Sequence, residues 1–216
     1  MLDRDAYFGR WTELHGGYDP AAQALSRTWL TAVHAVACRC GPIPPAAVTV
    51  AGLLVAAAVP VLALGAGPLP ALLAAVAVLL SGLLDSLDGA VAVTFGRDTR
   101  LGFVLDSLAD RIADSAYVVA LWVLGAPGWL CVLAGAVTAL QEYIRARAGA
   151  AGMSGIGVVT VWERPTRIVL AAVLLALSAV PAVPDGTFAT AGAGGWSLLA
   201  VIGVVQVLAA VRRELS

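Results

Sequence analysis

Two long stretches of the sequence contain no charged side chain. Residues 41–84 hold no Asp, Glu, Lys or Arg, and residues 115–141 are equally uncharged. About 20 apolar residues are enough to cross a bilayer as one helix, so the first stretch can cross, turn and cross again. Only 12% of all residues are charged, well below the content of ordinary soluble domains. The sequence therefore predicts an all-α integral membrane protein.

Runs of glycine and proline divide the apolar sequence. They lie at 65–70, 125–128 and 181–195, and such runs commonly separate helices. The sequence predicts six transmembrane helices, near 46–66, 69–92, 102–124, 128–149, 164–183 and 195–212. We expect one membrane domain over 46–216, preceded by a cytoplasmic or interfacial segment over 1–45.

The leading segment contains one stretch with an amphipathic pattern, residues 21–38. As a helix it would carry Leu25, Trp29, Val33 and Val36 on roughly one face, as expected of a helix lying on the bilayer surface. An ordinary cytoplasmic cap is an equally good interpretation of this segment.

The basic residues predict the orientation. All thirteen are arginines, and none lies in the three turns expected outside the cell. Because positively charged loops stay in the cytoplasm, we expect both termini and the active site to face the cytoplasm. The protein is expected to be a multi-pass protein of the plasma membrane, with membrane lipids and no nucleic acid among its partners.

Four acidic residues flank the junction of the second and third expected helices. Asp85 and Asp88 are three residues apart, and Asp106 and Asp110 are four apart. Either spacing puts a pair on one face of a helix. The connecting segment is short, so the two inner helix ends must be neighbours. The sequence predicts a pocket of four carboxylates.

These carboxylates need a cationic partner. Uncompensated, they would repel one another and lose hydration at membrane depth. Oxygen ligands select hard divalent ions, so we expect Mg²⁺ or Mn²⁺, with two ions per active site. The small residues Gly89, Ala92 and Gly102 would let a base or phosphate approach the backbone closely. The pocket is therefore predicted to hold a nucleotide diphosphate.

Two other interpretations of the acids remain. They could be helix-end charges paired with Arg97, Arg100 and Arg111. They could also mark an ion-coupled transporter, since intramembrane acids line ion pathways. Transporter sites tend to lie at the bilayer midplane in broken helices, whereas these acids gather near one interface.

The acids and their small neighbours also form a longer motif. It resembles the signature of the CDP-alcohol phosphatidyltransferase family, Asp-x2-Asp-Gly-x2-Ala-Arg, eight residues, Gly-x3-Asp-x3-Asp. Seven residues are in register: Asp85, Asp88, Gly89, Ala92, Gly102, Asp106 and Asp110. The resemblance implies metal-dependent transfer of a phosphatidyl group from CDP-diacylglycerol to a polar alcohol, with release of CMP. It also implies a homodimer, Asp110 as catalytic base, and donor contacts from Thr49 and Thr99.

The motif departs from the family at one position. Val93 stands where the family has an arginine that contacts the donor phosphates. Arg97 or Arg100 could supply a substitute guanidinium, because arginine suits bidentate phosphate recognition. The alternatives are a changed donor or a catalytically weakened, lipid-binding homologue.

Two further runs resemble the phosphatidylinositol phosphate synthase branch of this family. They are Tyr143-x-Arg145-Ala146-Arg147 and Glu163-Arg164-Pro165-x-Arg167. The resemblance implies inositol phosphate as the acceptor, with its phosphate held by Arg145, Arg147, Arg164 and Arg167. Anchoring at the inner membrane face is the other role open to each arginine, and glycerol phosphate or another alcohol remains an alternative acceptor. Asp114 is expected to pair with a nearby arginine.

Overall fold

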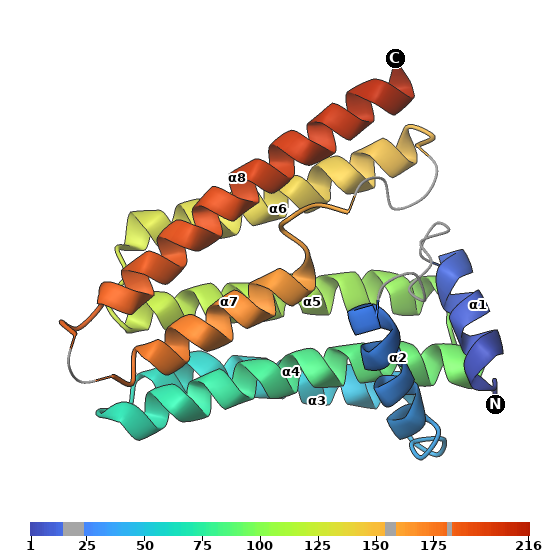
Figure 1. Cartoon of the computed structure of the whole chain (residues 1–216), viewed down its shortest axis with the longest axis horizontal. Coiled ribbons are helices and arrows are strands. Elements are labelled where there is room, and N and C mark those ends of the chain that lie inside the picture. Colours follow the sequence, from blue (N-terminus) through green and yellow to red (C-terminus); the bar gives the residue numbers. More distant parts are fainter. Residues whose placement is uncertain (15–23, 154–158, 181–182) are drawn as a thin grey trace.

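The computed structural model describes residues 1–14, 24–153, 159–180 and 183–216, and every regular element in these ranges is a helix. Two helices, α1 (Arg4–Leu14) and α2 (Ala24–Ala37), come first. Six more follow and run alongside one another (Figure 1): α3 (Pro45–Ala63), α4 (Pro68–Thr94), α5 (Arg100–Val123), α6 (Gly128–Ala150), α7 (Arg164–Leu177) and α8 (Thr187–Leu215). Both chain ends lie at the same end of this bundle.

Three of the helices, α3, α4 and α8, are long and apolar enough to cross a membrane. The other three of the bundle fall short of that description. The amino-terminal half of α5 and the carboxyl-terminal half of α6 carry charged residues, and α7 has only 14 residues. The prediction of an all-helical protein is confirmed.

The packing of the bundle is that of a membrane protein. On α3, the small Gly52 and Ala56 are buried, whereas Leu54 and Val61 are 69% and 66% exposed. Other helices repeat this arrangement, with alanine inside and leucine or valine outside. Soluble proteins bury their large apolar side chains. In lipid, small residues at the interfaces let helices approach closely while large apolar ones face the acyl chains.

The last two helix boundaries predicted from the sequence were wrong. We expected helices over 164–183 and 195–212, but α7 ends at Leu177 and α8 begins at Thr187. The glycine-rich run at 191–195 lies inside α8, where neighbouring helices pack too closely for a larger side chain at Gly192. A Cβ on Gly192 would lie 3.2 Å from side-chain atoms of Leu121 and Leu174.

Two glycines bring the turns at the far end of the bundle into contact. Gly125 follows α5 and Gly186 precedes α8, with φ angles of +102° and +79°. A Cβ on Gly186 would lie 3.1 Å from the carbonyl oxygen of Gly125. Both positions favour glycine, since other residues rarely adopt positive φ.

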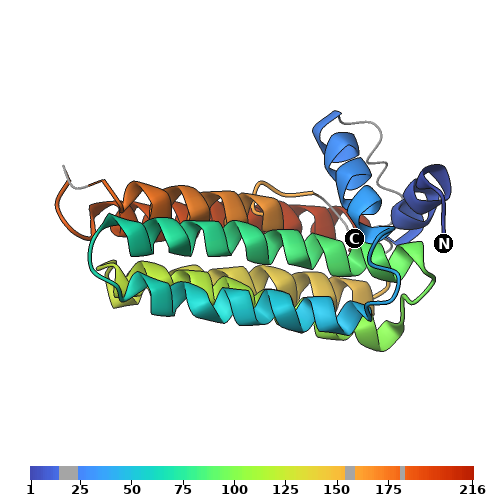
Figure 2. The same ribbon diagram turned by 90° about the horizontal axis from the view of Figure 1, so that it is seen from below.

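The amino-terminal helices cover the end of the bundle where α4 stops (Figure 2). The sequence predicted a helix over 21–38, and α2 occupies most of that range. Val33 is buried together with Leu30, whereas Trp29 and Val36 are exposed; the Leu25 side chain lies outside the described residues. Val33 belongs to an apolar cluster with Tyr7 of α1, a helix that the sequence did not predict. The Leu2 amide donates to the Thr94 carbonyl at 2.8 Å.

Candidate active site

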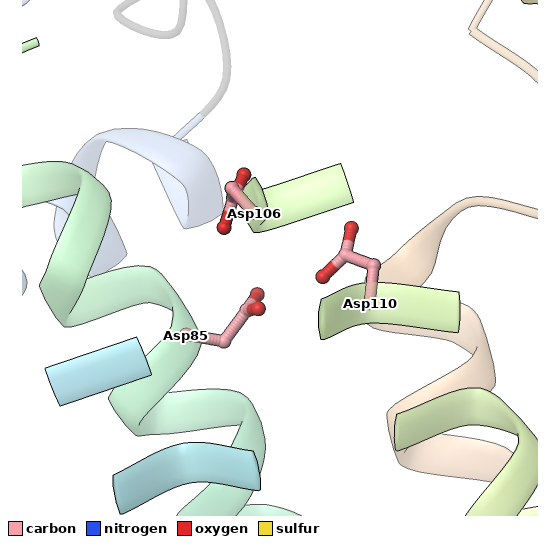
Figure 3. Close-up of side chains that lie close together, drawn as sticks. All are labelled: Asp85, Asp106 and Asp110. Carbon is pink, nitrogen blue, oxygen red and sulfur yellow. The ribbon is translucent and has the colours of Figure 1, made fainter. Parts of the chain in front are cut away.

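Three of the four predicted acids meet between α4 and α5. Asp85, on α4, faces Asp106 and Asp110, which lie one turn apart on α5 (Figure 3). One carboxylate oxygen from each residue lies within 4.8 Å of the other two. The predicted convergence of the two acidic faces is therefore observed.

The fourth acid, Asp88, lies outside this group of three and has a separate partner. Its side chain is buried and accepts a hydrogen bond of 2.5 Å from the Thr49 hydroxyl on α3. Thr49 and Asp88 had both been assigned to the donor site on sequence grounds. The structure brings them together across 39 positions of sequence.

Arg164 joins the acids from the first turn of α7. Its Nε lies 2.9 Å from Asp85 Oδ2, and its Nη1 lies 2.5 Å from Asp110 Oδ1. The sequence predicted Arg164 only as an acceptor ligand. No local sequence pattern predicts its contact with Asp85, since 79 positions separate the two residues.

A second ionic network lies behind the acids. Arg167, only 1% exposed, reaches Asp114 Oδ2 at 2.9 Å and Glu142 Oε1 at 2.7 Å. Arg111 lies 3.5 Å from Asp114 and 3.2 Å from Glu142. The expected pairing of Asp114 with an arginine is confirmed, and its place one turn after Asp110 was the signal. Glu142 was missed, because it lies outside any motif used for the prediction.

Arg145 and Arg147 lie in different environments near the carboxyl-terminal end of α6. Arg145 forms an ion pair with Glu163, which also accepts from the Thr160 amide at 2.7 Å. Burial alone would raise the pKa of Glu163, but the bonds from Arg145 and Thr160 outweigh burial and lower it. Arg147 is exposed and has no ion pair within the described ranges.

The remaining predicted donor residues lie around the α4–α5 connection. Thr99 caps α5, since its hydroxyl accepts from the Gly102 amide at 3.0 Å. Arg97 donates to the Ile43 carbonyl at 3.2 Å. A Cβ on Gly89 would meet nothing within 4 Å. The backbone at Gly89 is thus open to a ligand, as the sequence suggested, whereas Ala92 is half-buried.

Val93, the departure from the family motif, is buried. It belongs to an apolar cluster with Tyr7 of α1 and Val33 of α2. An arginine here would have to displace those helices or leave its charge among apolar side chains. Within the described structure, Val93 therefore packs the amino-terminal helices and is not turned towards the acids.

The acidic group fits a divalent cation by its chemistry. Its donors are carboxylate oxygens only, the ligand type preferred by Mg²⁺ and Mn²⁺. Asp110 Oδ1 is buried without a directed hydrogen bond, and Asp106 has no ion pair in the part of the chain described. Asp106 therefore keeps its charge for a metal, whereas Asp110 shares its charge with Arg164.

Comparison with known proteins defines the relationship of this chain. The profile of CDP-alcohol phosphatidyltransferase matches residues 42–210. The chain belongs to this family. The family resemblance read from the Asp motif is thereby confirmed.

Curated relatives match over parts of their length. Phosphatidylinositol phosphate synthase of Mycobacterium tuberculosis is 38% identical over 130 residues, covering 57% of this chain and 58% of the relative. Archaetidylinositol phosphate synthase of Aeropyrum pernix is 37% identical over 101 residues, covering 46% and 50%. The matched segments thus span about half the length of these relatives.

The fold matches over more of the chain. The crystal structure of the M. tuberculosis phosphatidylinositol phosphate synthase with CDP-DAG bound has a TM-score of 0.68 and 29% identity, covering 83% of this chain and 92% of that one. The same enzyme in complex with manganese and citrate also gives 0.68 and 29%, covering 83% and 88%.

Proposed function

We propose that this protein is a phosphatidylinositol phosphate synthase. It would transfer the phosphatidyl group of CDP-diacylglycerol to inositol phosphate and release CMP. The observation that carries this proposal is the group of three carboxylates within 4.8 Å, at the end of the bundle where the arginines gather. The names of the relatives support the choice of both substrates.

The acids are proposed to hold the metal. Asp85, Asp106 and Asp110 would supply oxygen ligands, with Asp88 completing a site for two Mg²⁺ or Mn²⁺ ions. When bound, such ions neutralise the charge of the diphosphate and of the departing CMP. The manganese complex of the related enzyme supports the choice of metal class.

The donor would lie over the α4–α5 connection. The open backbone at Gly89 supports close approach of a phosphate or base. The exposed apolar side chains of α5 next to the acids support a lipid donor whose acyl chains stay in the membrane, among them Leu101, Phe103 and Leu105. The proposed donor residues are Thr49, Asp88, Gly89, Ala92, Arg97, Thr99 and Gly102.

Asp110 is proposed as the general base. It would take the proton of the acceptor hydroxyl at a carboxylate oxygen as that hydroxyl attacks the donor phosphorus. Positioning and electrostatics then supply most of the remaining acceleration.

The acceptor phosphate is proposed to meet Arg145, Arg147, Arg164 and Arg167. Arg147 is exposed and ready for an anion. Arg145 and Arg167 are shared with Glu163 and Glu142. A phosphate would therefore compete with these carboxylates, and bidentate arginine contacts favour it in that competition.

The membrane arrangement follows from the positive-inside rule. We propose six spans over 46–216, an interfacial segment over 1–45 with α1 and α2, cytoplasmic termini, and an active site facing the cytoplasm at the plasma membrane. Both termini lie at the same end of the bundle, which supports an even number of membrane crossings (Figure 1). The alanine- and glycine-rich helices would permit close packing in a homodimer.

CMP release from CDP-diacylglycerol tests the proposal. The purified protein in detergent is given Mg²⁺ or Mn²⁺ with inositol phosphate, glycerol phosphate, inositol or no acceptor. Release that requires inositol phosphate and metal is expected. Asp110→Asn should abolish it, whereas Asp5→Asn, a change on the exposed face of α1, should not. No release with any acceptor from folded protein would indicate a changed donor or a silent homologue.

A further inference from the structure

The metal site contains a cation of its own, the guanidinium of Arg164. We propose that Arg164 is the resident counter-ion of the Asp85–Asp110 pair, and that metal binding releases it to grip the anion of the acceptor. This inference rests on the proposed function and adds an order to it: metal first, acceptor second.

The contacts show which groups Arg164 serves. It bridges Asp85 on α4 and Asp110 on α5, at 2.9 and 2.5 Å, and so offsets one of the negative charges on the three carboxylates that would ligate the metal. A divalent cation on the same carboxylates would weaken their attraction for the guanidinium. Metal and Arg164 therefore compete for the same negative charge.

The position of Arg164 in α7 points in the same direction. Arg164 is the first residue of the helix, followed by Pro165, and the helix dipole disfavours a cation at this end. Its side chain is only 14% exposed, so it has also lost hydration. The acids, rather than the local sequence, hold the guanidinium where it is.

The grip of Arg164 on Asp110 is incomplete. Its Nη1 is buried and makes no directed hydrogen bond, despite lying 2.5 Å from Asp110 Oδ1. Arginine binds best when two N–H groups face two oxygens of one anion. A phosphate group would satisfy this donor better than the present contact does.

The two neighbouring arginines are held mainly by other acids. Arg167 and Arg111 are both paired with Asp114 and Glu142. Arg111 also reaches Asp110, but only at 3.5 Å, compared with 2.5 Å for Arg164. Counting those two acids with the four of the motif gives six carboxylates against three guanidiniums, which leaves three negative charges. A divalent ion is therefore attracted even while Arg164 is present, and its arrival weakens the hold of Asp85 and Asp110 on Arg164.

The reciprocity of linked equilibria gives a test that does not depend on turnover. Mn²⁺ binding to purified protein is measured from the free-ion EPR signal, and binding of inorganic phosphate is measured with and without Mn²⁺. Arg164→Gln should tighten Mn²⁺ binding by about tenfold, within the usual range of such couplings. It should also remove the strengthening of phosphate binding by Mn²⁺ that the wild type is expected to display.

Two further variants control for folding and for net charge. Arg164→Lys keeps the charge without the fork and should leave Mn²⁺ binding near wild type while weakening phosphate binding. Arg212→Gln removes an exposed arginine outside the proposed site and should leave Mn²⁺ affinity unchanged. Unchanged or weaker Mn²⁺ binding in Arg164→Gln would show that Arg164 only clamps the helices together. If wild-type protein couples Mn²⁺ to phosphate yet forms no lipid product, the proposed function fails and this inference stands.

Discussion

Replacing Arg167 by Met should destabilise the protein by about 3 kcal/mol, because it removes one partner from a buried ionic network. The guanidinium is 1% exposed and contacts Asp114 and Glu142 at 2.9 and 2.7 Å. Methionine preserves much of the apolar stem but no charge. The change therefore isolates the cost of leaving two carboxylates without their main cation.

The size of the destabilisation depends on the ion pairs that remain after Arg167 is replaced. Removing one partner of a buried ion pair costs about 3–5 kcal/mol. Arg111 stays 3.5 Å from Asp114 and 3.2 Å from Glu142, which offsets part of the loss and favours the lower end of that range. In a chain of this size, about 3 kcal/mol corresponds to a fall of roughly 6–12 °C in Tm.

Thermal unfolding in detergent measures the effect. A thiol-reactive dye reports the exposure of buried Cys131 once Cys38 and Cys40 have been replaced by serine. Arg147→Met is the matched control and should leave Tm nearly unchanged. Adding Asp114→Asn should recover part of the Arg167→Met loss, since it removes the charge left unpaired. A Tm within about 1 °C of wild type, or a double variant worse than the single one, would refute the reasoning.

Three other changes test other parts of the structure. Val93→Arg should lower Tm and give no gain in CMP release, because Val93 packs against Tyr7; a large rate gain would mean that the donor site had decayed there. Gly203→Ala should cost about 1–3 kcal/mol by overpacking, since its Cβ would lie 2.8 Å from Trp162 Cβ; equal Tm values would contradict the close approach. Because the pKa of Glu163 is lowered from 4.5, the stability it adds is present above that pH and lost as pH falls through the lowered pKa. The advantage of wild type over Glu163→Gln should shrink in acid, and a constant difference would speak against the ion pair.

The sequence predicted what depends on local spacing. The breaks near Gly65 and Gly125 separated helices correctly, because glycine and proline act on the backbone within a few residues. The i,i+4 spacing of Asp106 and Asp110 likewise fixed one shared face of α5. Glycines inside α8 misled the prediction, since only the packed structure shows that Gly192 must admit Leu121.

What the sequence could not predict depends on contacts between distant segments. The insertion of Arg164 between Asp85 and Asp110, and the pairing of Asp88 with Thr49, follow from how α7 and α3 lie against α4. Charge and motif placed these residues in the site but not against particular partners. The environment of Val93 depended in the same way on an amino-terminal helix that no pattern indicated.

The contact between Gly125 and Gly186 is a point about which α8 could pivot relative to α5. At that end the turns after α5 and before α8 touch, whereas the α6–α8 pair diverges from the other helices towards the end with the acids (Figure 1). At 1.5 Å per residue, α8 is roughly 40 Å long. A tilt of roughly 5° about its amino-terminal end would therefore move its carboxyl-terminal end by roughly 3–4 Å. A bulky side chain at either glycine would push the two turns apart and tilt α8 relative to α5. The displacement would be largest at the opposite end of the bundle, where the arginines and carboxylates meet.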